Sequence, residues 1–161
     1  MQFAIGAYDP ALREQIIALS LRAWSPVFEG MKKAVPSFVY RSFYPNGWKH
    51  RQRTDVARFL DDEGERVRVA IADGRVLGWV GIRCHDEDRL GEIYMLAVEP
   101  GDQRNGIARI LIKHAEDTLR GEGMKLVMVE TGGDPGHAPA RACYENAAYE
   151  TWPVARYFRR L

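Results

Sequence analysis

Hydrophobic and polar positions change their spacing along the chain in a way that separates strands from helices. A short apolar run over residues 3–8 closes at Asp9-Pro10 and predicts a strand, and Pro10 suits the first turn of a following helix. The apolar side of that helix is expected to consist of Leu12, Ile16, Leu19 and Ala23. Residues 24–62 have a less regular pattern, with aromatic residues dispersed among prolines, glycines and basic residues. We expect one or two helices there, joined by loops.

The next part of the pattern predicts three consecutive strands. Apolar residues alternate with polar or small ones over residues 67–71, and a second apolar run resumes directly after Asp73-Gly74. This arrangement predicts a hairpin with a tight two-residue turn. The charged residues 85–89 make the following turn, and residues 92–98 form an apolar run of the kind that suits a strand covered on both faces.

The best-defined helix of the chain is expected after Glu99-Pro100-Gly101. Its apolar positions fall at helical spacing, and glycines at 121 and 123 are expected to end it. The apolar positions are Ile107, Ile110, Leu111, Ala115 and Leu119. Four further elements are expected after it: a buried strand over 126–129, a glycine-rich loop over 131–137, a short helix over 139–148, and a final strand from Tyr149 to about Phe158.

The predicted order is strand, helices, three strands, helix, strand, helix, strand, without a repeat or a linker that would divide the chain. This order predicts one mixed α/β domain over residues 1–161, an α+β arrangement around a mixed sheet. The strand-helix-strand unit over residues 92–129 should be a right-handed crossover with parallel strands.

Composition and charge narrow the function classes. With 161 residues, 46% of them hydrophobic, the chain can bury one self-sufficient core. A net charge of +1 argues against a nucleic-acid or acidic-membrane partner. No basic flank precedes a long apolar run at the N-terminus, and no apolar stretch is long enough for a membrane span. We therefore expect a cytoplasmic protein whose cysteines, Cys84 and Cys143, are reduced.

The most informative stretch lies between a predicted strand and the start of the best-defined helix. It reads Gln103, Arg104, Asn105, Gly106, Ile107, Ala108, and Arg109 follows it. A helix N-terminus offers unpaired N–H groups and the positive end of the helix dipole, so it attracts phosphate oxygens. Small residues at Gly106 and Ala108 let a phosphate approach, and Arg104 and Arg109 add charged donors. The alternative is a plain turn with a solvated arginine face.

Other residues and motifs help to decide between a phosphate site and a plain turn. Asp102 would repel a phosphate; the alternative is that it serves only as a helix N-cap, a position that Asp favours. The phosphate loops of nucleotide hydrolases and of dinucleotide-binding folds are absent, because neither of their glycine spacings occurs here. Nucleotide hydrolysis and hydride transfer are therefore not expected.

Gln103-x-x-Gly106-x-Ala108, placed after the strand Glu-Ile-Tyr-Met-Leu-Ala-Val, resembles the acetyl-CoA signature of the GNAT N-acetyltransferases. The predicted element order resembles that fold over essentially the whole chain, and the motifs cover residues 92–149. The resemblance implies an N-acetyltransferase that transfers acetyl from acetyl-CoA, its acyl donor, to a primary amine of a small molecule or peptide. It also implies that Leu96, Ala97 and Val98 contact the pantetheine arm along the strand edge.

The resemblance extends to a second motif, a tyrosine followed after four residues by an aromatic. Tyr144 and Tyr149 fill these places, which implies that Tyr144 protonates the departing thiolate. An ordinary phenol pKa of about 10 lies above that of a thiol at about 8.5, so a positioned phenol is a plausible acid. The alternative is that Tyr144 is a core aromatic on the same helix face as Ala140 and Ala147.

An amine must lose a proton before it attacks a thioester, so the site needs a base. Glu92 opens the strand before the signature, where some members of the family have a catalytic glutamate. Glu92 is our candidate base; the alternative is a solvent-facing carboxylate at a strand end.

Two positions depart from the family pattern. His137 stands where the family often has Asn, and Ala148 where it often has Gly. His137 is therefore left open as a replacement group toward the cofactor or as a second proton acceptor. No metal is expected at His137, because it has no partner at ligand spacing.

The acceptor side is expected in residues 24–48. The aromatics there could stack on an amine, or they could simply pack helices together. A basic set could favour an acidic acceptor or the CoA phosphates, or form a solvated face: Lys32, Lys33, Arg41, Lys49, Arg51 and Arg53. The alternative function is a non-catalytic module that binds or senses acyl-CoA. A homodimer through the last strands is also open.

Overall fold

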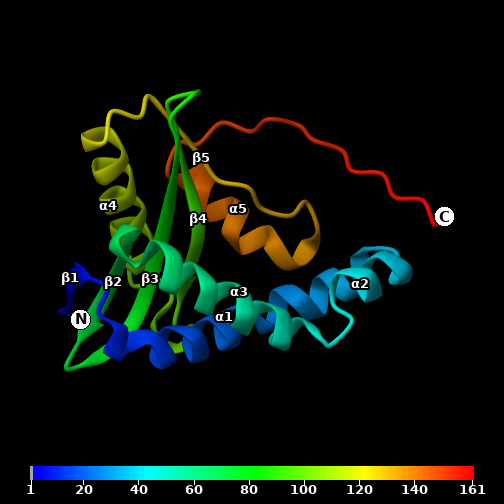
Figure 1. The fold of residues 1–161 in the computed structure, drawn as a ribbon, viewed down its shortest axis with the longest axis horizontal. Coiled ribbons are helices and arrows are strands. Elements are labelled where there is room, and N and C mark those ends of the chain that lie inside the picture. The colour runs from blue at the N-terminus through cyan, green and yellow to red at the C-terminus, as the bar shows by residue number, and fades with distance from the viewer. Residues whose placement is uncertain (1) are drawn as a thin grey trace.

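The computed structural model describes residues 2–161 as a mixed sheet with helices on both faces (Figure 1). The strands are β1 (Ala4–Ala7), β2 (Val67–Ala72), β3 (Arg75–His85), β4 (Leu90–Val98) and β5 (Leu126–Met128). The helices are α1 (Arg13–Ala34), α2 (Ser37–Phe43), α3 (Trp48–Glu63), α4 (Ile107–Gly121) and α5 (Ala138–Asn146), together with four short 3-10 turns. Up to α5, this order agrees with the order predicted from the sequence.

The five strands lie side by side in chain order, β1-β2-β3-β4-β5. The first four pair antiparallel, and β5 pairs parallel to β4, as expected for strands that flank the α4 crossover. The β2–β3 hairpin turns on Asp73 and Gly74, which both have positive φ, at 49° and 73°. These angles are those of the two-residue turn that the Asp-Gly pair predicts.

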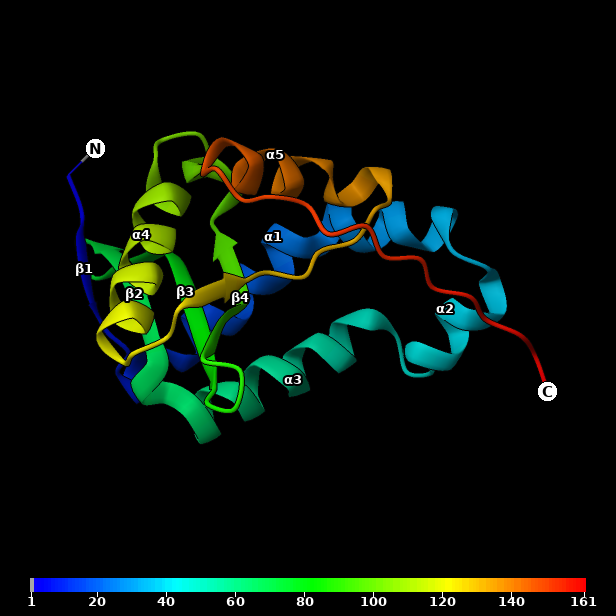
Figure 2. The same cartoon turned by 90° about the horizontal axis from the view of Figure 1, so that it is seen from above.

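Two apolar clusters occupy opposite faces of the sheet. Residues of α1 and α3 pack on one face, where Trp79 is fully buried and donates a hydrogen bond from its indole to Ser20 Oγ at 2.8 Å. Residues of α4 pack on the other face, and Tyr144 of α5 joins that cluster. Seen from above, α4 and α5 lie on one side of the sheet and α3 on the other (Figure 2).

A bulge in β4 shapes the centre of the sheet. The register of β3 with β4 shifts between Gly81 and Ile82, so that Tyr94 is the extra residue on β4. Pairing of β4 with β5 is confined to residues 90–92 on β4. The C-terminal half of β4 therefore has one edge that β5 does not cover.

The region between β1 and β2 is more helical than the sequence suggested. α1 continues through Pro26 to Ala34, and two further helices follow it. Its aromatics pack mostly on one another: the Phe28 ring stacks on Trp48 at 4.5 Å between centroids and meets Tyr44 edge-on at 5.4 Å. For Phe28, Tyr44 and Trp48 the packing interpretation is thus the one that the structure supports.

Two predictions at the C-terminal end were wrong. The strand at 126–129 was expected to be buried, but Leu126 of β5 is 63% exposed, because its side chain packs in neither of the two apolar clusters. The final strand expected from Tyr149 to about Phe158 does not form. Residues 149–161 instead run as an extended segment above α5 toward α2 (Figures 1 and 2). Without a paired neighbour, the β-forming side chains of this segment cannot make a strand.

Candidate active site

The loop between β4 and α4 has the backbone of an anion site. Gly106 is the N-cap of α4 with φ of 80°, and Arg104 before it also has positive φ, at 63°. No side chain caps the helix, so its first N–H groups remain available, and backbone turns of this kind form concave anion sites. A Cβ at Gly106 would meet no atom within 4 Å, which shows that the space in front of the loop is open.

One side chain near this loop anchors the start of the helix in the core, and four others are exposed to solvent. Ile107 is buried in the α4 cluster and fixes the start of the helix. Gln103, Arg104, Asn105 and Arg109 are exposed. Neither Arg104 nor Arg109 forms an ion pair within residues 2–161. Both guanidinium groups are therefore free to meet an anion.

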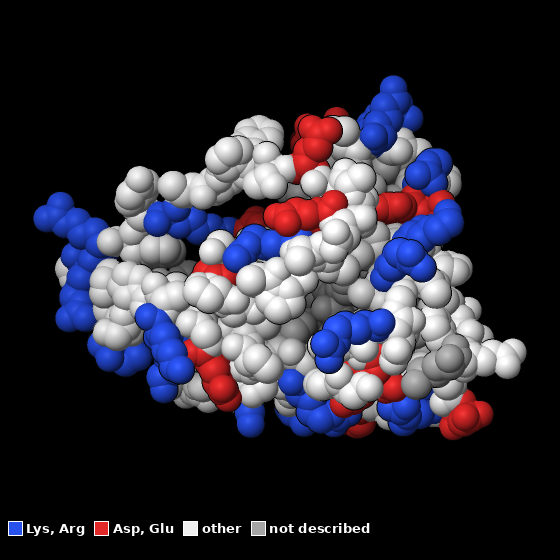
Figure 3. Space-filling model, turned by 180° about the vertical axis from the view of Figure 1, so that it is seen from behind, with Lys and Arg blue, Asp and Glu red and all other residues white. Residues whose placement is uncertain are grey.

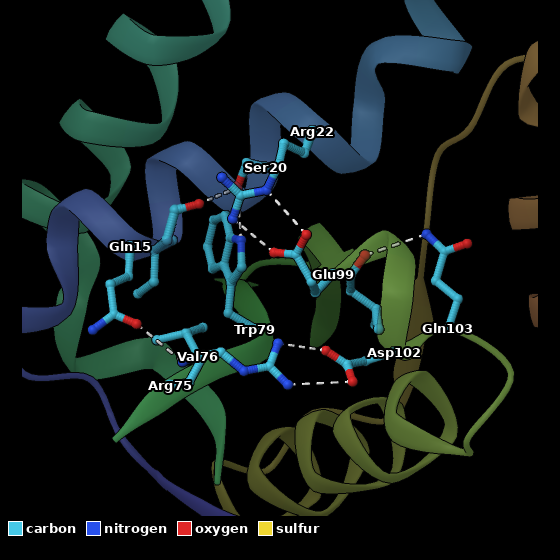
Figure 4. Close-up of polar contacts among 11 residues, drawn as sticks. Gln15, Ser20, Arg22, Arg75, Val76, Trp79, Glu99, Asp102 and Gln103 are labelled. Atoms are coloured by element: carbon cyan, nitrogen blue, oxygen red, sulfur yellow. Dashed lines mark hydrogen bonds and ion pairs between the residues drawn. The ribbon is translucent and has the colours of Figure 1, made fainter. Parts of the chain in front are cut away.

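Two carboxylates next to the loop are neutralised by arginines from distant parts of the chain (Figure 4). Arg75 binds Asp102 through both terminal nitrogens, at 2.7 and 3.4 Å, and Arg22 binds Glu99 at 2.7 and 2.9 Å. Asp102 is 5% exposed, and Gly106, not Asp102, caps α4. The repulsion expected from Asp102 is thus compensated by Arg75, and its anticipated N-cap role is not the one it plays.

The uncovered edge of β4 carries main-chain acceptors. The Trp24 indole N–H donates to Leu96 O at 3.3 Å, and the Gln103 amide donates to Val98 O at 3.2 Å. Main-chain groups alternate between the two edges of a strand, so Leu96 and Val98 face the open edge while Ala97, opposite Trp79, faces β3. Each carbonyl oxygen has a second lone pair. The open edge can therefore pair with a further extended chain.

Tyr144 lies on α5 against the α4 cluster, with its ring centroid 5.8 Å from that of Tyr149. Burial raises the pKa of Tyr144 to about 12. Its hydroxyl makes no hydrogen bond within residues 2–161, yet no buried polar side-chain atom there lacks a partner, so the hydroxyl must reach solvent. Tyr144 is thus a core aromatic whose hydroxyl has no protein partner within residues 2–161.

Tyr149 has a different role. Its hydroxyl donates to Glu116 Oε1 at 2.9 Å, which ties the end of α5 to α4. Burial, and then the bond to Glu116, raise the pKa of Tyr149 above its ordinary value. Ala148 between the two tyrosines has φ of 64°, a left-handed conformation that Gly adopts with less strain than Ala.

Glu92 lies in β4 at the last position paired with β5, just before the bulge. Its side chain is only 16% exposed, and its Oε2 atom lies 2.9 Å from His85 Nε2 on β3. The solvent-facing alternative for Glu92 therefore does not describe this carboxylate.

His137 sits at the end of the loop that follows β5. Its Nδ1 atom lies 2.6 Å from Asp134 Oδ2, and Arg141 donates to the carbonyl oxygens of Gly132 and Asp134. Burial opposes ionisation of Asp134, but the hydrogen bond and charge of His137 outweigh it and lower the pKa of that carboxyl. The imidazole is 18% exposed, and its Nε2 atom has no partner within residues 2–161.

Sequence reasoning missed the contacts of four contributors, Arg22, Trp24, Arg75 and His85. Arg75 and Trp24 are far in sequence from the groups they bind, so no local pattern could reveal them. His85 could have been placed from the hairpin register, because it stands seven residues before Glu92 across a short turn.

The surface has two cavities, and the second of them borders the ion pairs beside the loop. One cavity of about 500 Å³ lies between α2 and residues 158–161, and one of about 380 Å³ lies beside Arg22 and Glu99. Charges of both signs are interspersed over the face shown in Figure 3. Within residues 2–161, no group of three or more His, Cys, Asp or Glu could hold a metal ion, and no helix is long and apolar enough to cross a membrane.

Comparison with known proteins supports the family resemblance. The family model "Acetyltransferase (GNAT) family" matches residues 37–149. A mycothiol acetyltransferase from Kocuria rhizophila is 31% identical over 113 residues, which cover 67% of this chain and 37% of that protein. The chain spans about a third of the length of the curated relatives it matches.

Solved structures share the fold at low sequence identity. A GNAT-family acetyltransferase from Staphylococcus aureus Mu50 has a TM-score of 0.69 at 14% identity, covering 91% of this chain and 83% of that one. The PaiA N-acetyltransferase from Thermoplasma acidophilum, solved with coenzyme A, has a TM-score of 0.63 at 15% identity, covering 91% and 89%. Together with the matched residues 37–149, these findings show that the chain belongs to the GNAT acetyltransferase family.

Proposed function

We propose that residues 1–161 form one catalytic domain that transfers acetyl from acetyl-CoA to a primary amine of a small molecule or peptide. The observation that carries the proposal is the meeting of an open β4 edge with an uncapped, unobstructed α4 N-terminus. The open β4 edge can pair with an extended amide chain such as pantetheine, and the α4 N-terminus can bind phosphate groups such as the pyrophosphate. Acetyl-CoA contains both.

Acetyl-CoA would bind as the acyl-donor substrate. Leu96 and Val98 would pair with the pantetheine amides, and the main chain of residues 103–108 would hold the pyrophosphate, with Arg104 and Arg109 adding charge. Arg75 and Arg22 support this role indirectly, because they cancel the carboxylates that flank the loop. His137 Nε2 is the remaining candidate contact from the β5 loop.

The chemistry requires proton removal from the amine and proton delivery to the thiolate. Glu92 would accept the ammonium proton, after which the amine nitrogen attacks the thioester carbonyl. As the carbon–sulfur bond breaks, the Tyr144 hydroxyl would donate to the departing sulfur. Its pKa of about 12 keeps that hydroxyl protonated at neutral pH, so the donor is present in every turnover.

The names of related proteins bear on the acceptor only as a class. The matched relatives are named mycothiol acetyltransferases, and the structural neighbours include the PaiA N-acetyltransferase and a ribosomal-protein-S18-alanine N-acetyltransferase from Escherichia coli. Each of these names describes transfer of an acetyl group, but one protein fold can serve many different acceptors, so the names do not identify the acceptor of this chain.

The test is thiol release from acetyl-CoA with four amines: glucosamine, spermidine, tyramine and a peptide with a free N-terminal alanine. We expect at least one to be acetylated, with loss of turnover in Glu92→Gln by about 100-fold. Binding of acetyl-CoA without turnover on any of the four would favour a non-catalytic acyl-CoA-binding module.

A further inference from the structure

The Glu92 carboxylate is paired with an imidazole on the neighbouring strand. His85 ends β3 and Glu92 lies near the start of β4, and the register of the two strands brings His85 Nε2 to 2.9 Å from Glu92 Oε2. Both residues lie in strand positions on either side of one short turn, so the pair is held by the main chain of the hairpin.

The two side chains differ in their access to solvent. The Glu92 side chain is 16% exposed, whereas that of His85 is 43% exposed. A proton on Glu92 therefore has an adjacent acceptor that leads directly to water. Histidine suits this position because its ring has two nitrogens, so it can accept a proton at one and release a proton from the other.

Arg83, the charged residue opposite Glu92 on β3, is engaged elsewhere. Arg83 lies opposite Glu92 in the register, but its Nε atom binds Glu63 of α3 at 2.7 Å and its guanidinium stacks on Tyr94 of β4 at 3.5 Å from the ring centroid. β5 contributes the uncharged Met128 beside Glu92. Within residues 2–161, Glu92 has no other side-chain hydrogen bond or ion pair than the one to His85.

We propose that His85 is the proton relay of the acetyl transfer, passing to solvent the proton that Glu92 removes from the acceptor ammonium. The proposal rests on the proposed function, and specifically on Glu92 as base. In this proposal His85 acts through Glu92, so it is a positioning and relay residue and not a catalytic residue.

The proton balance of the reaction requires such an exit. An ammonium and acetyl-CoA give an amide, CoA thiol and one free proton. Of the two protons that the nitrogen loses, one replaces the proton that Tyr144 gives to sulfur, and the other must leave. In each cycle Glu92 takes that proton from nitrogen and gives it to His85 Nε2, and the other ring nitrogen of His85 releases a proton to water. Proton exchange between the exposed ring and water then restores the starting tautomer, with Nε2 free to accept again.

The test compares wild type, His85→Gln, Glu92→Gln and the double variant, using the amine of the four above that wild type acetylates fastest. His114→Gln is the matched control, because His114 is an exposed histidine on α4. For His85→Gln we expect kcat to fall about 10-fold while KM for acetyl-CoA stays within about 2-fold. Added imidazole should restore part of the lost rate in His85→Gln and have no effect on wild type or His114→Gln.

The double variant distinguishes a relay from a separate role. Because His85 acts only through Glu92, the double variant should be no slower than Glu92→Gln alone. If the rate loss of the double variant equals the product of the two single losses, His85 does not act through Glu92 and the relay is overturned. A His85→Gln rate that imidazole leaves unchanged would overturn it as well. If Glu92→Gln retains full rate, the assignment of Glu92 as base fails; if wild type acetylates none of the four amines, the proposed function fails, and the relay falls with it.

Discussion

The loops that follow the parallel strands β4 and β5 are held in place in different ways. The β4 loop is anchored by ion pairs to α1 and β3, through Arg22–Glu99 and Arg75–Asp102, and leaves its main-chain N–H groups open. The β5 loop is anchored by close backbone packing: a Cβ on Gly136 would lie 2.8 Å from Val27 O of α1. The first loop thus leaves its main chain open, as the proposed anion site requires, and the second holds α5 and His137 in position.

The largest effect is expected at the β4 loop. Gly106→Glu places bulk and negative charge at a left-handed N-cap, so the dissociation constant of CoA should rise by about 100-fold or more. Calorimetric titration with CoA measures it. Gly121→Glu puts the same side chain at the opposite end of α4, in open space, and should leave affinity nearly unchanged. If Gly106→Glu binds CoA as tightly as Gly121→Glu does, the anion site lies elsewhere.

Tyr144→Phe should affect turnover and not binding. The ring stays in its cluster while the donor to sulfur is removed, so kcat should fall by about 100-fold with the affinity for acetyl-CoA retained. Wild type should show no loss of rate from Tyr144 deprotonation between about pH 6 and 10, because its pKa is about 12. Tyr149→Phe, which loses only the bond to Glu116, is the control. Similar kcat losses in both variants would indicate a packing role for Tyr144.

Gly136→Ala tests the packing of the β5 loop on α1. The new Cβ would approach Val27 O at 2.8 Å, so the free energy of unfolding should fall by about 1–3 kcal/mol. Gly133→Ala, where a Cβ meets nothing within 4 Å, should change it by less than about 0.5 kcal/mol. Chemical denaturation of both variants measures the difference, and equal stabilities would contradict the close contact with α1.

Arg75→Ala tests the charge compensation of the β4 loop. Asp102 would stay buried without its partner, and CoA affinity should fall by about 10-fold, with a smaller loss at high salt. Adding Asp102→Asn should restore most of the affinity, because the uncompensated charge is then removed. Titration of the double variant checks this, and no recovery would show that Arg75 acts in another way.

Ala148→Gly should give the smallest effect, and in the stabilising direction. The left-handed φ of 64° strains Ala but not Gly, so after the backbone entropy of Gly is counted the gain should be about 0.5–1 kcal/mol. A rise in Tm would confirm it. A fall would mean that α5 ends differently.

Local signals predicted much of this fold. The Asp73-Gly74 turn, the helical spacing of α4 and the order of elements up to α5 all follow from neighbouring residues. Neighbouring residues also predict that the signature loop lies at the start of α4 and that Tyr144 lies on the helix α5.

The predictions that were wrong concern residues whose structure depends on contacts with distant parts of the chain. The C-terminal segment has strand-forming residues, but β5 offers an edge only three residues long, and the segment runs past α5 toward α2 instead of pairing with it (Figure 1). The buried Asp102 was judged as a lone charge, because its partner Arg75 is 27 residues away. The acceptor, the domain boundaries and homodimer formation stay predictions.

The most direct test of the central claim is the thermal stability of the protein with acetyl-CoA, CoA and ATP over a concentration series. A ligand at about 100 times its dissociation constant stabilises the native state by about 2.7 kcal/mol. We predict that Tm rises with acetyl-CoA and CoA and stays unchanged with ATP. No rise with either CoA compound would contradict a CoA site at the β4 edge and the α4 N-terminus, and with it the proposed transfer.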